Sequence, residues 1–318
     1  MLESIAMRWP VLLVFALGAC GDDGPPAPPF DSSVMPPDDG APEVVPCTTC
    51  WVPAPGSAKN WDVQLTAPFD LSVQRAMYDL DLFDVVPSPQ TLSYADGDLV
   101  IPAGTLPTAI ADLQAANTKV VCHLGAGLID TTDPDAAKFP TALIGKDTHS
   151  WQNGFTTVRS IDYRDPRILA LVEKRLDLAK QIGCDAVEPD GIDSFKDDTG
   201  FVLTEDDEIK YFYQVAAEAH RRTLSVGMKN VFQVPNVIDA LPAVYDWMFT
   251  LRCAEFLDCG LETAFIVASK AVFGVDIKAP DATGHGIAVA AACTAFGTAM
   301  VDGIVKDDTL TKTLTTCP

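Results

Sequence analysis

The stretch GCDAVEPDGIDSF at 183–195 begins as an apolar strand and then places three carboxylates, Glu188, Asp190 and Asp193, close together. Side chains two residues apart on a strand point to the same face, so Glu188 and Asp190 are predicted to lie side by side. Two neighbouring acids titrate at different pH values, and near neutral pH one is protonated while the other is ionised. Glycoside hydrolysis requires such a pair: an acid that protonates the leaving oxygen and a carboxylate that attacks the sugar or activates water.

The elements that must position these acids are short apolar runs separated by longer helical segments. The runs are 61–65, 80–86, 119–127, 159–163, 184–190, 224–230, 247–255 and 271–277. Strands that alternate with helices form parallel sheets, and eight of them favour an α/β fold of the (β/α)8 TIM-barrel type. An open doubly wound sheet is the alternative, but no GxGxxG loop follows the first run.

Polar residues stand near the C-terminal ends of these runs. They are Gln64, Asp84, His123, Asp162, Glu188, Asp190, Lys229, Asn230, Glu255 and Asp276. In a barrel those ends meet at one face, where such enzymes place their active sites. Grouped carboxylates repel one another and resist burial, so their convergence indicates function more than structure. Trp61 and Trp151 are either sugar-stacking platforms or packing residues.

Other chemistries lack a sequence signature. The chain has four His, without HxH or HExxH spacing, and it has no GxSxG motif, so we expect neither a metal nor a serine nucleophile, and no cofactor. The formal net charge of −22 disfavours nucleic acid, because phosphate contacts need Lys and Arg. A cationic or neutral ligand fits this charge better, although solubility alone is another explanation. We expect a monomer.

The N-terminus reads as an export signal. PVLLVFALGA is an apolar run too short to span a membrane, and the LGAC that ends it resembles a bacterial lipobox with Cys20 as the lipidated residue. We therefore expect a signal peptide at 1–20, a disordered Pro- and Asp-rich tether at 21–52 and a catalytic domain at 53–318. The domain would be periplasmic or extracellular, held to the cell envelope by lipid alone.

Eight cysteines remain after Cys20, an even number that suits an oxidising compartment. Cys253 and Cys259 close a short loop and are predicted to pair. The CTTC at 47–50 is either a disulfide, two thiols paired elsewhere, or half of a zinc site that has no second half nearby. For Cys122 and Cys184, within strand-like runs, unpaired core cysteine and a mutual disulfide both stay open.

Several segments together resemble glycoside hydrolase family 114, the endo-α-1,4-polygalactosaminidases. They are VVCHLGAG, SIDYRDPRI, IGCDAVEPDGID, TGFVLTEDD, SVGMKN and CAEFLDC, in order within 61–318. The resemblance implies a TIM barrel acting on α-1,4-linked galactosamine polymers, with Asp190 and Glu255 as the catalytic pair on the fifth and seventh runs. Glu188, Asp84, Lys229 and Asn230 would line the same cleft. The last cysteine-bounded segment implies a Cys293–Cys317 disulfide, and the de-N-acetylated polymer would be a polycation that suits the net charge.

The sequence also departs from the family's pattern. Gly191 follows EPD where the family usually has Asn, and CHLGAG places His123 and Leu124 where it has aromatic residues. Asp276 and Ile277 replace a Glu-Tyr pair at the last strand. A non-catalytic carbohydrate-binding surface lipoprotein on a degenerate barrel is therefore the alternative to a glycosidase.

Overall fold

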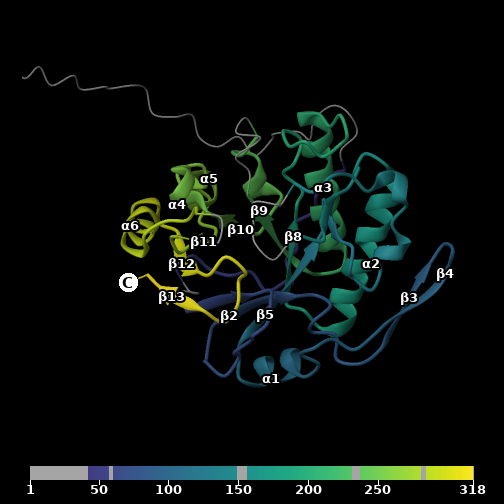
Figure 1. Cartoon of the computed structure of the whole chain (residues 1–318), viewed down its shortest axis with the longest axis horizontal. Coiled ribbons are helices and arrows are strands. Elements are labelled where there is room, and N and C mark those ends of the chain that lie inside the picture. The colour runs from purple at the N-terminus through teal and green to yellow at the C-terminus, as the bar shows by residue number, and fades with distance from the viewer. Residues whose placement is uncertain (1–41, 57–59, 149–155, 231–236, 281–283, 318) are drawn as a thin grey trace, which may run out of the picture. The chain divides into compact units, whose positions relative to one another are not determined.

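The computed structural model describes residues 42–56, 60–148, 156–230, 237–280 and 284–317. Within them, eight parallel strands follow one another in chain order around a barrel (Figure 1). They are β1 (Trp61–Gln64), β2 (Met77–Asp81), β5 (Lys119–Gly125), β8 (Ala186–Asp190), β9 (Ser225–Lys229), β10 (Trp247–Leu251), β11 (Val272–Ile277) and β12 (Asp302–Lys306). Strand β13 (Leu314–Thr316) adds antiparallel to β12. The predicted barrel is confirmed.

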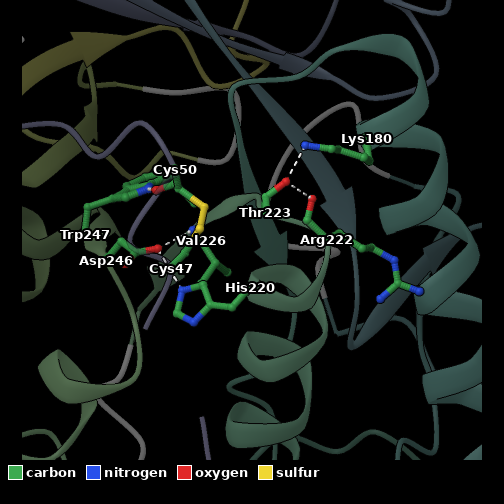
Figure 2. Close-up of a disulfide and its surroundings, with 10 residues drawn as sticks. Cys47, Cys50, Lys180, His220, Arg222, Thr223, Val226, Asp246 and Trp247 are labelled. Atoms are coloured by element: carbon green, nitrogen blue, oxygen red, sulfur yellow. Dashed lines mark hydrogen bonds and ion pairs between the residues drawn. A yellow bond between two sulfur atoms is a disulfide. The ribbon is translucent and has the colours of Figure 1, made fainter. Parts of the chain in front are cut away.

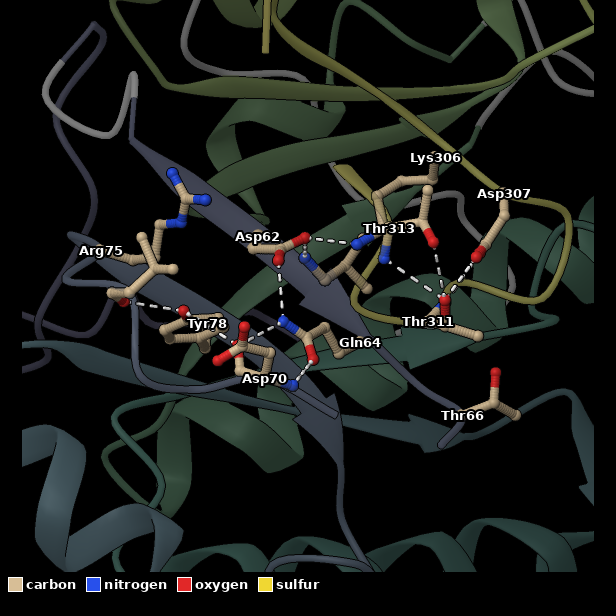
Figure 3. Close-up of polar contacts among 12 residues, drawn as sticks. Asp62, Gln64, Thr66, Asp70, Arg75, Tyr78, Lys306, Asp307, Thr311 and Thr313 are labelled. Atoms are coloured by element: carbon tan, nitrogen blue, oxygen red, sulfur yellow. Dashed lines mark hydrogen bonds and ion pairs between the residues drawn. The ribbon is translucent and has the colours of Figure 1, made fainter. Parts of the chain in front are cut away.

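Side chains close the barrel between its first and last parallel strands. Lys306 Nζ lies 2.5 Å from Asp62 Oδ1, and both residues are buried (Figure 3). The indole Nε1 of Trp61 donates to the carbonyl oxygen of Asp302 at 3.0 Å. These contacts join residues that are more than 240 positions apart in the sequence.

One predicted barrel strand was wrong. The run 159–163 contributes β7 (Val158–Ser160), which pairs antiparallel with β6 (Leu128–Asp130) in a separate two-stranded sheet. The eighth barrel strand is β12, which begins with Asp302 and Gly303, a dipeptide that reads as a turn. Gly303 suits this strand because the Phe296 ring occupies the place of a Cβ, 1.9 Å from where that atom would stand.

Helices and short hairpins connect the strands. The helices are α1 (Ala109–Ala115), α2 (Pro166–Ile182), α3 (Glu205–Arg221), α4 (Cys253–Phe256), α5 (Thr263–Val267) and α6 (Val289–Ala299), with 3₁₀ turns at Ala136–Lys138, Thr141–Leu143 and Leu241–Ala243. A second hairpin joins β3 (Gln90–Tyr94) to β4 (Gly97–Ile101). Helix α2 begins with Pro166 at its first position and is capped by Gly183 in the left-handed conformation. No helix in the described part of the chain is long and apolar enough to cross a membrane.

Alternate residues along each barrel strand belong to two different apolar clusters. Trp61, Phe249 and Phe273 belong to the apolar cluster that fills the barrel, with ring centroids 5.1 to 5.8 Å from Trp61. The neighbouring strand positions pack against the helices in a second cluster. Whether a polar residue near a strand end faces the barrel or the helices therefore depends on its parity along the strand.

The described cysteines form four disulfides. Cys253–Cys259 and Cys293–Cys317 are confirmed, and Cys122 pairs with Cys184 and Cys47 with Cys50. Figure 2 shows the Cys47–Cys50 disulfide with its surroundings, which include Trp247 and the paired His220 and Asp246. Val44 and Trp51 pack against the two apolar clusters, so residues 42–52, which the sequence assigned to the tether, lie on the domain. Cys20 and the rest of the predicted leader and tether lie outside the described residues, as does Trp151.

Candidate active site

Two cations and two carboxylates from three adjacent strands meet at the C-terminal end of the barrel. Lys229, the last residue of β9, places its Nζ 3.1 Å from Asp190 Oδ2 and 3.2 Å from Glu188 Oε1. His123, on β5, places Nε2 3.1 Å from the same Asp190 oxygen. Asp190 is the last residue of β8, so the sequence correctly predicted that these four strand-end residues converge.

His123 lies between carboxylates on two sides. Its Nε2 is also 3.8 Å from Glu188 Oε2, and its Nδ1 is 3.8 Å from Asp81 Oδ2 on β2. Burial disfavours the imidazolium, but Glu188, Asp190 and Asp81 outweigh burial and raise the pKa of His123 to about 10. His123 is therefore positively charged at neutral pH. Lys229 follows the same logic: burial opposes its charge, yet Asp190 and Glu188 raise its pKa.

Glu188 and Asp79 are the deepest acids of this cluster. Both are fully buried, and burial is the main cause that raises the pKa of each. For Glu188 the nearby charges of Lys229 and His123 oppose that rise. For Asp79 the charge of Glu188 adds to it, and neither carboxyl oxygen of Asp79 has a hydrogen-bond partner among the described residues. Both conditions favour a protonated Asp79.

Sequence reasoning missed Asp79 and Asp81. The run it used, 80–86, starts too late: β2 spans Met77–Asp81, and the chain then turns. Asp84 consequently lies beyond the strand, where its Oδ1 accepts a hydrogen bond from Thr105 at 2.6 Å. The signal was present in MYDLD, where Met77, Asp79 and Asp81 alternate onto one face.

Glu255 comes from α4, beyond the end of β10, where it is held by several neighbours. Arg252 Nε donates to its Oε2 at 2.6 Å, and the backbone N–H of Gly286 donates to its Oε1 at 2.9 Å. The Cys253–Cys259 disulfide closes this loop. Leu251, the last residue of β10, is apolar at the position where β8 and β9 end in Asp190 and Lys229.

The strand numbering of the predicted pair needs correction. Because run 159–163 is not a barrel strand, Asp190 ends the fourth strand and Glu255 follows the sixth, instead of belonging to the fifth and seventh. The two acids still come from alternate strands, with Lys229 on the strand between them.

Asp276 was predicted to line the cleft, but it faces away from it. Its neighbours Val275 and Ile277 belong to the core inside the barrel, so Asp276 points toward the outer layer. It is fully buried there, and its two oxygens accept the backbone N–H groups of Ala254 and Glu255 at 3.1 and 3.0 Å. Burial raises the pKa of Asp276 to about 6. Asp276 therefore holds the N-terminus of α4 in place.

Gln64 and Trp61 also lie outside the cleft, Gln64 on the outer face and Trp61 within the barrel core, where the packing alternative holds for Trp61. Gln64 is buried and faces outward, where its amide bridges Asp62 and both backbone groups of Asp70 (Figure 3). Trp61 is 1% exposed and packs inside the barrel, so it cannot stack on a sugar.

Asn230 and Asp162 have local partners. Asn230 follows β9 in the left-handed conformation, and its Oδ1 accepts the backbone N–H of Leu251 at 2.9 Å. Asp162 follows β7 in the hairpin and forms a two-point ion pair with Arg164. Among the described residues, no group of three or more His, Cys, Asp or Glu side chains is arranged to hold a metal ion.

Comparisons with known proteins identify the family and the fold of this chain. Residues 42–318 match the model of glycoside-hydrolase family GH114. The crystal structure of Aspergillus fumigatus Ega3 in complex with galactosamine is 27% identical, covers 87% of this chain and 100% of that chain, and gives a TM-score of 0.70. The glycoside hydrolase domain of PelA from Pseudomonas aeruginosa, 14% identical over 81% of this chain and 97% of that one with a TM-score of 0.53, shares the fold. No curated protein sequence matches the chain.

Proposed function

Because the chain belongs to glycoside-hydrolase family GH114, we propose that it cleaves α-1,4-linked, galactosamine-containing polysaccharide with Asp190 and Glu255 as its catalytic carboxylates. Family and fold make the chain a glycosidase, and the substrate and the two roles are the proposal. Ega3, the relative with 27% identity, was crystallised with galactosamine.

The observation that carries the mechanism is the pair of cations on one oxygen of Asp190. Lys229 Nζ and His123 Nε2 each lie 3.1 Å from Asp190 Oδ2. Two adjacent positive charges stabilise the ionised carboxylate. Asp190 therefore serves as the carboxylate that attacks the anomeric carbon or activates water, and its other oxygen, Oδ1, accepts the N–H of Gly191 at 2.7 Å.

Glu255 is then the proton donor to the leaving oxygen. In the unliganded protein Arg252 and the Gly286 N–H both donate to its carboxylate, and these contacts favour the ionised form. Proton donation requires that bound substrate weaken the contact with Arg252. A chain in which that contact persists would bind carbohydrate without cleaving it, and this contact is the observation that favours the second candidate function, a carbohydrate-binding surface protein.

The net charge supports a cationic polymer as substrate. With 44 acidic and 22 basic residues, the chain attracts a polycation, and de-N-acetylated galactosaminan carries one ammonium on each free galactosamine. The attraction acts over about 10 Å at 0.1 M salt and is screened at higher ionic strength.

The test is release of reducing ends from partly de-N-acetylated α-1,4-galactosaminan. Chitosan, a β-1,4-linked glucosamine polymer of matched charge, is the control. We expect cleavage of the first polymer only, and loss of cleavage in Asp190→Asn. Binding of galactosaminan without any release of reducing ends would overturn the hydrolytic proposal and support the binding protein.

We also propose that the domain is exported and held to the cell envelope through Cys20. The four disulfides suit an oxidising compartment. Mass spectrometry of the membrane fraction tests the proposal, and a mature N-terminus other than a diacylglyceryl Cys20 would contradict it.

A further inference from the structure

The loop after β10 exposes an aromatic ring next to the proposed proton donor. Phe256 follows Glu255 in α4 and is 57% exposed. It is the one aromatic residue among the exposed large hydrophobic side chains of the described part of the chain. The sequence suggested Trp61 as a sugar-stacking platform, but Trp61 is buried, and among the described residues Phe256 is the exposed ring next to Glu255.

The backbone of this loop is held in an unfavourable conformation. Arg252, before α4, and Leu257, after it, have φ angles of 66° and 63°, in the left-handed region that disfavours residues with a Cβ. Such conformations persist where surrounding contacts impose them, and they concentrate at functional sites. Here the Cys253–Cys259 disulfide and the capping contacts of Asp276 impose them. The loop is therefore fixed before any ligand arrives.

Arg252 connects the exposed ring to the acid. Its Nε lies 2.6 Å from Glu255 Oε2, and its Cζ lies 5.8 Å from the centroid of the Phe256 ring. The Arg252 guanidinium thus lies between the Phe256 ring and the Glu255 carboxylate. Arg252 is itself buried, so the exposed part of the Phe256 ring is left to face solvent.

From this arrangement we propose that Phe256 is the stacking platform of a sugar subsite adjoining Glu255. The inference rests on the proposed function and adds a place for a second sugar unit. The occupant is a galacto-configured pyranose, whose axial C–H groups make one face apolar and able to stack on an aromatic ring. Its amino or acetamido group would project toward solvent, so this subsite accepts both forms.

Binding is measured in the full chain carrying Asp190→Asn, which removes turnover. The probe is a defined α-1,4-linked galactosamine hexamer, titrated by calorimetry. Three further changes are compared in this background: Phe256→Ala, Phe256→Trp, and Leu257→Ala as the matched control. Leu257 is 90% exposed in the same disulfide loop, so its truncation removes similar apolar surface without an aromatic ring.

We expect Phe256→Ala to weaken hexamer binding about tenfold, which corresponds to about 1.4 kcal/mol. Phe256→Trp should bind at least as well as the parent and show a change in tryptophan fluorescence on binding. Leu257→Ala should bind as the parent does. In the active chain, Phe256→Ala should raise KM with kcat nearly unchanged.

Two results would overturn the subsite. Equal hexamer affinity of the parent and Phe256→Ala would remove it directly. A fall in kcat without a rise in KM would mean that Phe256 acts only by positioning Arg252 and Glu255. Failure of the parent chain to bind the hexamer at all would instead refute the proposed substrate, so the two failures are distinguishable.

Discussion

His123 and Asp190 lie on adjacent barrel strands, with Nε2 of the first 3.1 Å from Oδ2 of the second. The imidazolium of His123 stands where the sequence resemblance led us to expect an aromatic residue. It adds a second positive charge beside the carboxylate that we assign to attack the substrate. The electrostatics of the site can be tested through this residue.

We expect His123→Gln to shift the acidic limb of the pH profile of kcat/KM to higher pH. Without the imidazolium, less positive charge stabilises the Asp190 carboxylate, so Asp190 accepts a proton more readily. His220→Gln is the matched control, because His220 is also a buried histidine paired with an aspartate but lies outside the site. An unchanged acidic limb in His123→Gln would contradict the role of His123.

The same histidine makes stability depend on pH. Its pKa is raised from 6.5 to about 10 in the folded protein. The resulting stabilisation is fully present below about pH 6.5 and is lost as the pH rises through about 10. Urea unfolding at pH 6, 8 and 10.5 should show a loss of stability in the wild type that is smaller in His123→Gln. Parallel pH curves for the two proteins would argue against a charged His123.

Asp190→Asn and Glu255→Gln should each lower kcat by about 10²–10⁴-fold, the usual range for removing an acid or base. Polymer binding should stay nearly unchanged, whereas the melting temperature should fall, because the buried cations Lys229 and Arg252 each lose a charged partner. Reducing-end assays, calorimetry and thermal unfolding measure the three quantities. Near-wild-type hydrolysis by either variant would refute its assignment.

The two short disulfide loops should behave differently. Replacing Cys253 and Cys259 by alanine frees the loop that presents Glu255, so we expect kcat to fall while the barrel stays folded. Replacing Cys47 and Cys50 by alanine alters a loop outside the site and should leave kcat unchanged. Each loop is short, so each change should cost about 2–3 kcal/mol of stability or less. Equal kcat in both double variants would show that the first disulfide does not position Glu255.

The buried ion pair between Lys306 and Asp62, which joins the first and last parallel strands, should contribute more to the free energy of unfolding than a surface pair does. Lys306→Met leaves the buried Asp62 carboxylate without its cation and should cost about 3–5 kcal/mol. Lys146→Met breaks an exposed pair with Asp198 and should cost about 1 kcal/mol or less. Adding Asp62→Asn to Lys306→Met should recover part of the loss. Urea unfolding measures all three variants. Equal losses of stability in Lys306→Met and Lys146→Met would contradict a larger contribution from the buried pair.

Hydrophobic runs and motif resemblance predicted the barrel and the central cluster. Glu188, Asp190 and Lys229 could be found because strand ends of a parallel barrel meet at one face, and that rule does not depend on knowing exact strand limits. The Cys253–Cys259 pair was found because its loop is short. Each of these inferences depends only on the order and spacing of residues along the chain.

The errors came from residue parity and strand limits. Gln64 and Asp276 stand near strand ends but on the outward face, and a one-residue difference decides between the cleft and the helix layer. Asp79 was missed because the apolar run seemed to begin at Leu80. Strand β12 was missed because Gly303 is explained only by the ring of Phe296, which the sequence does not place beside it.

The contacts between β1 and β12 also limit when the barrel can close during folding. Asp62 and Lys306 are 244 residues apart in the sequence. The contacts between β1 and β12 can therefore form only after β12 has been made. A polypeptide delivered N-terminus first, by a ribosome or an export channel, keeps one edge of β1 open until almost all of the domain has emerged. Contacts of such long sequence separation form slowly, and open strand edges invite aggregation in the meantime. The incompletely synthesised or exported domain is therefore the stage at which this fold is most exposed to aggregation.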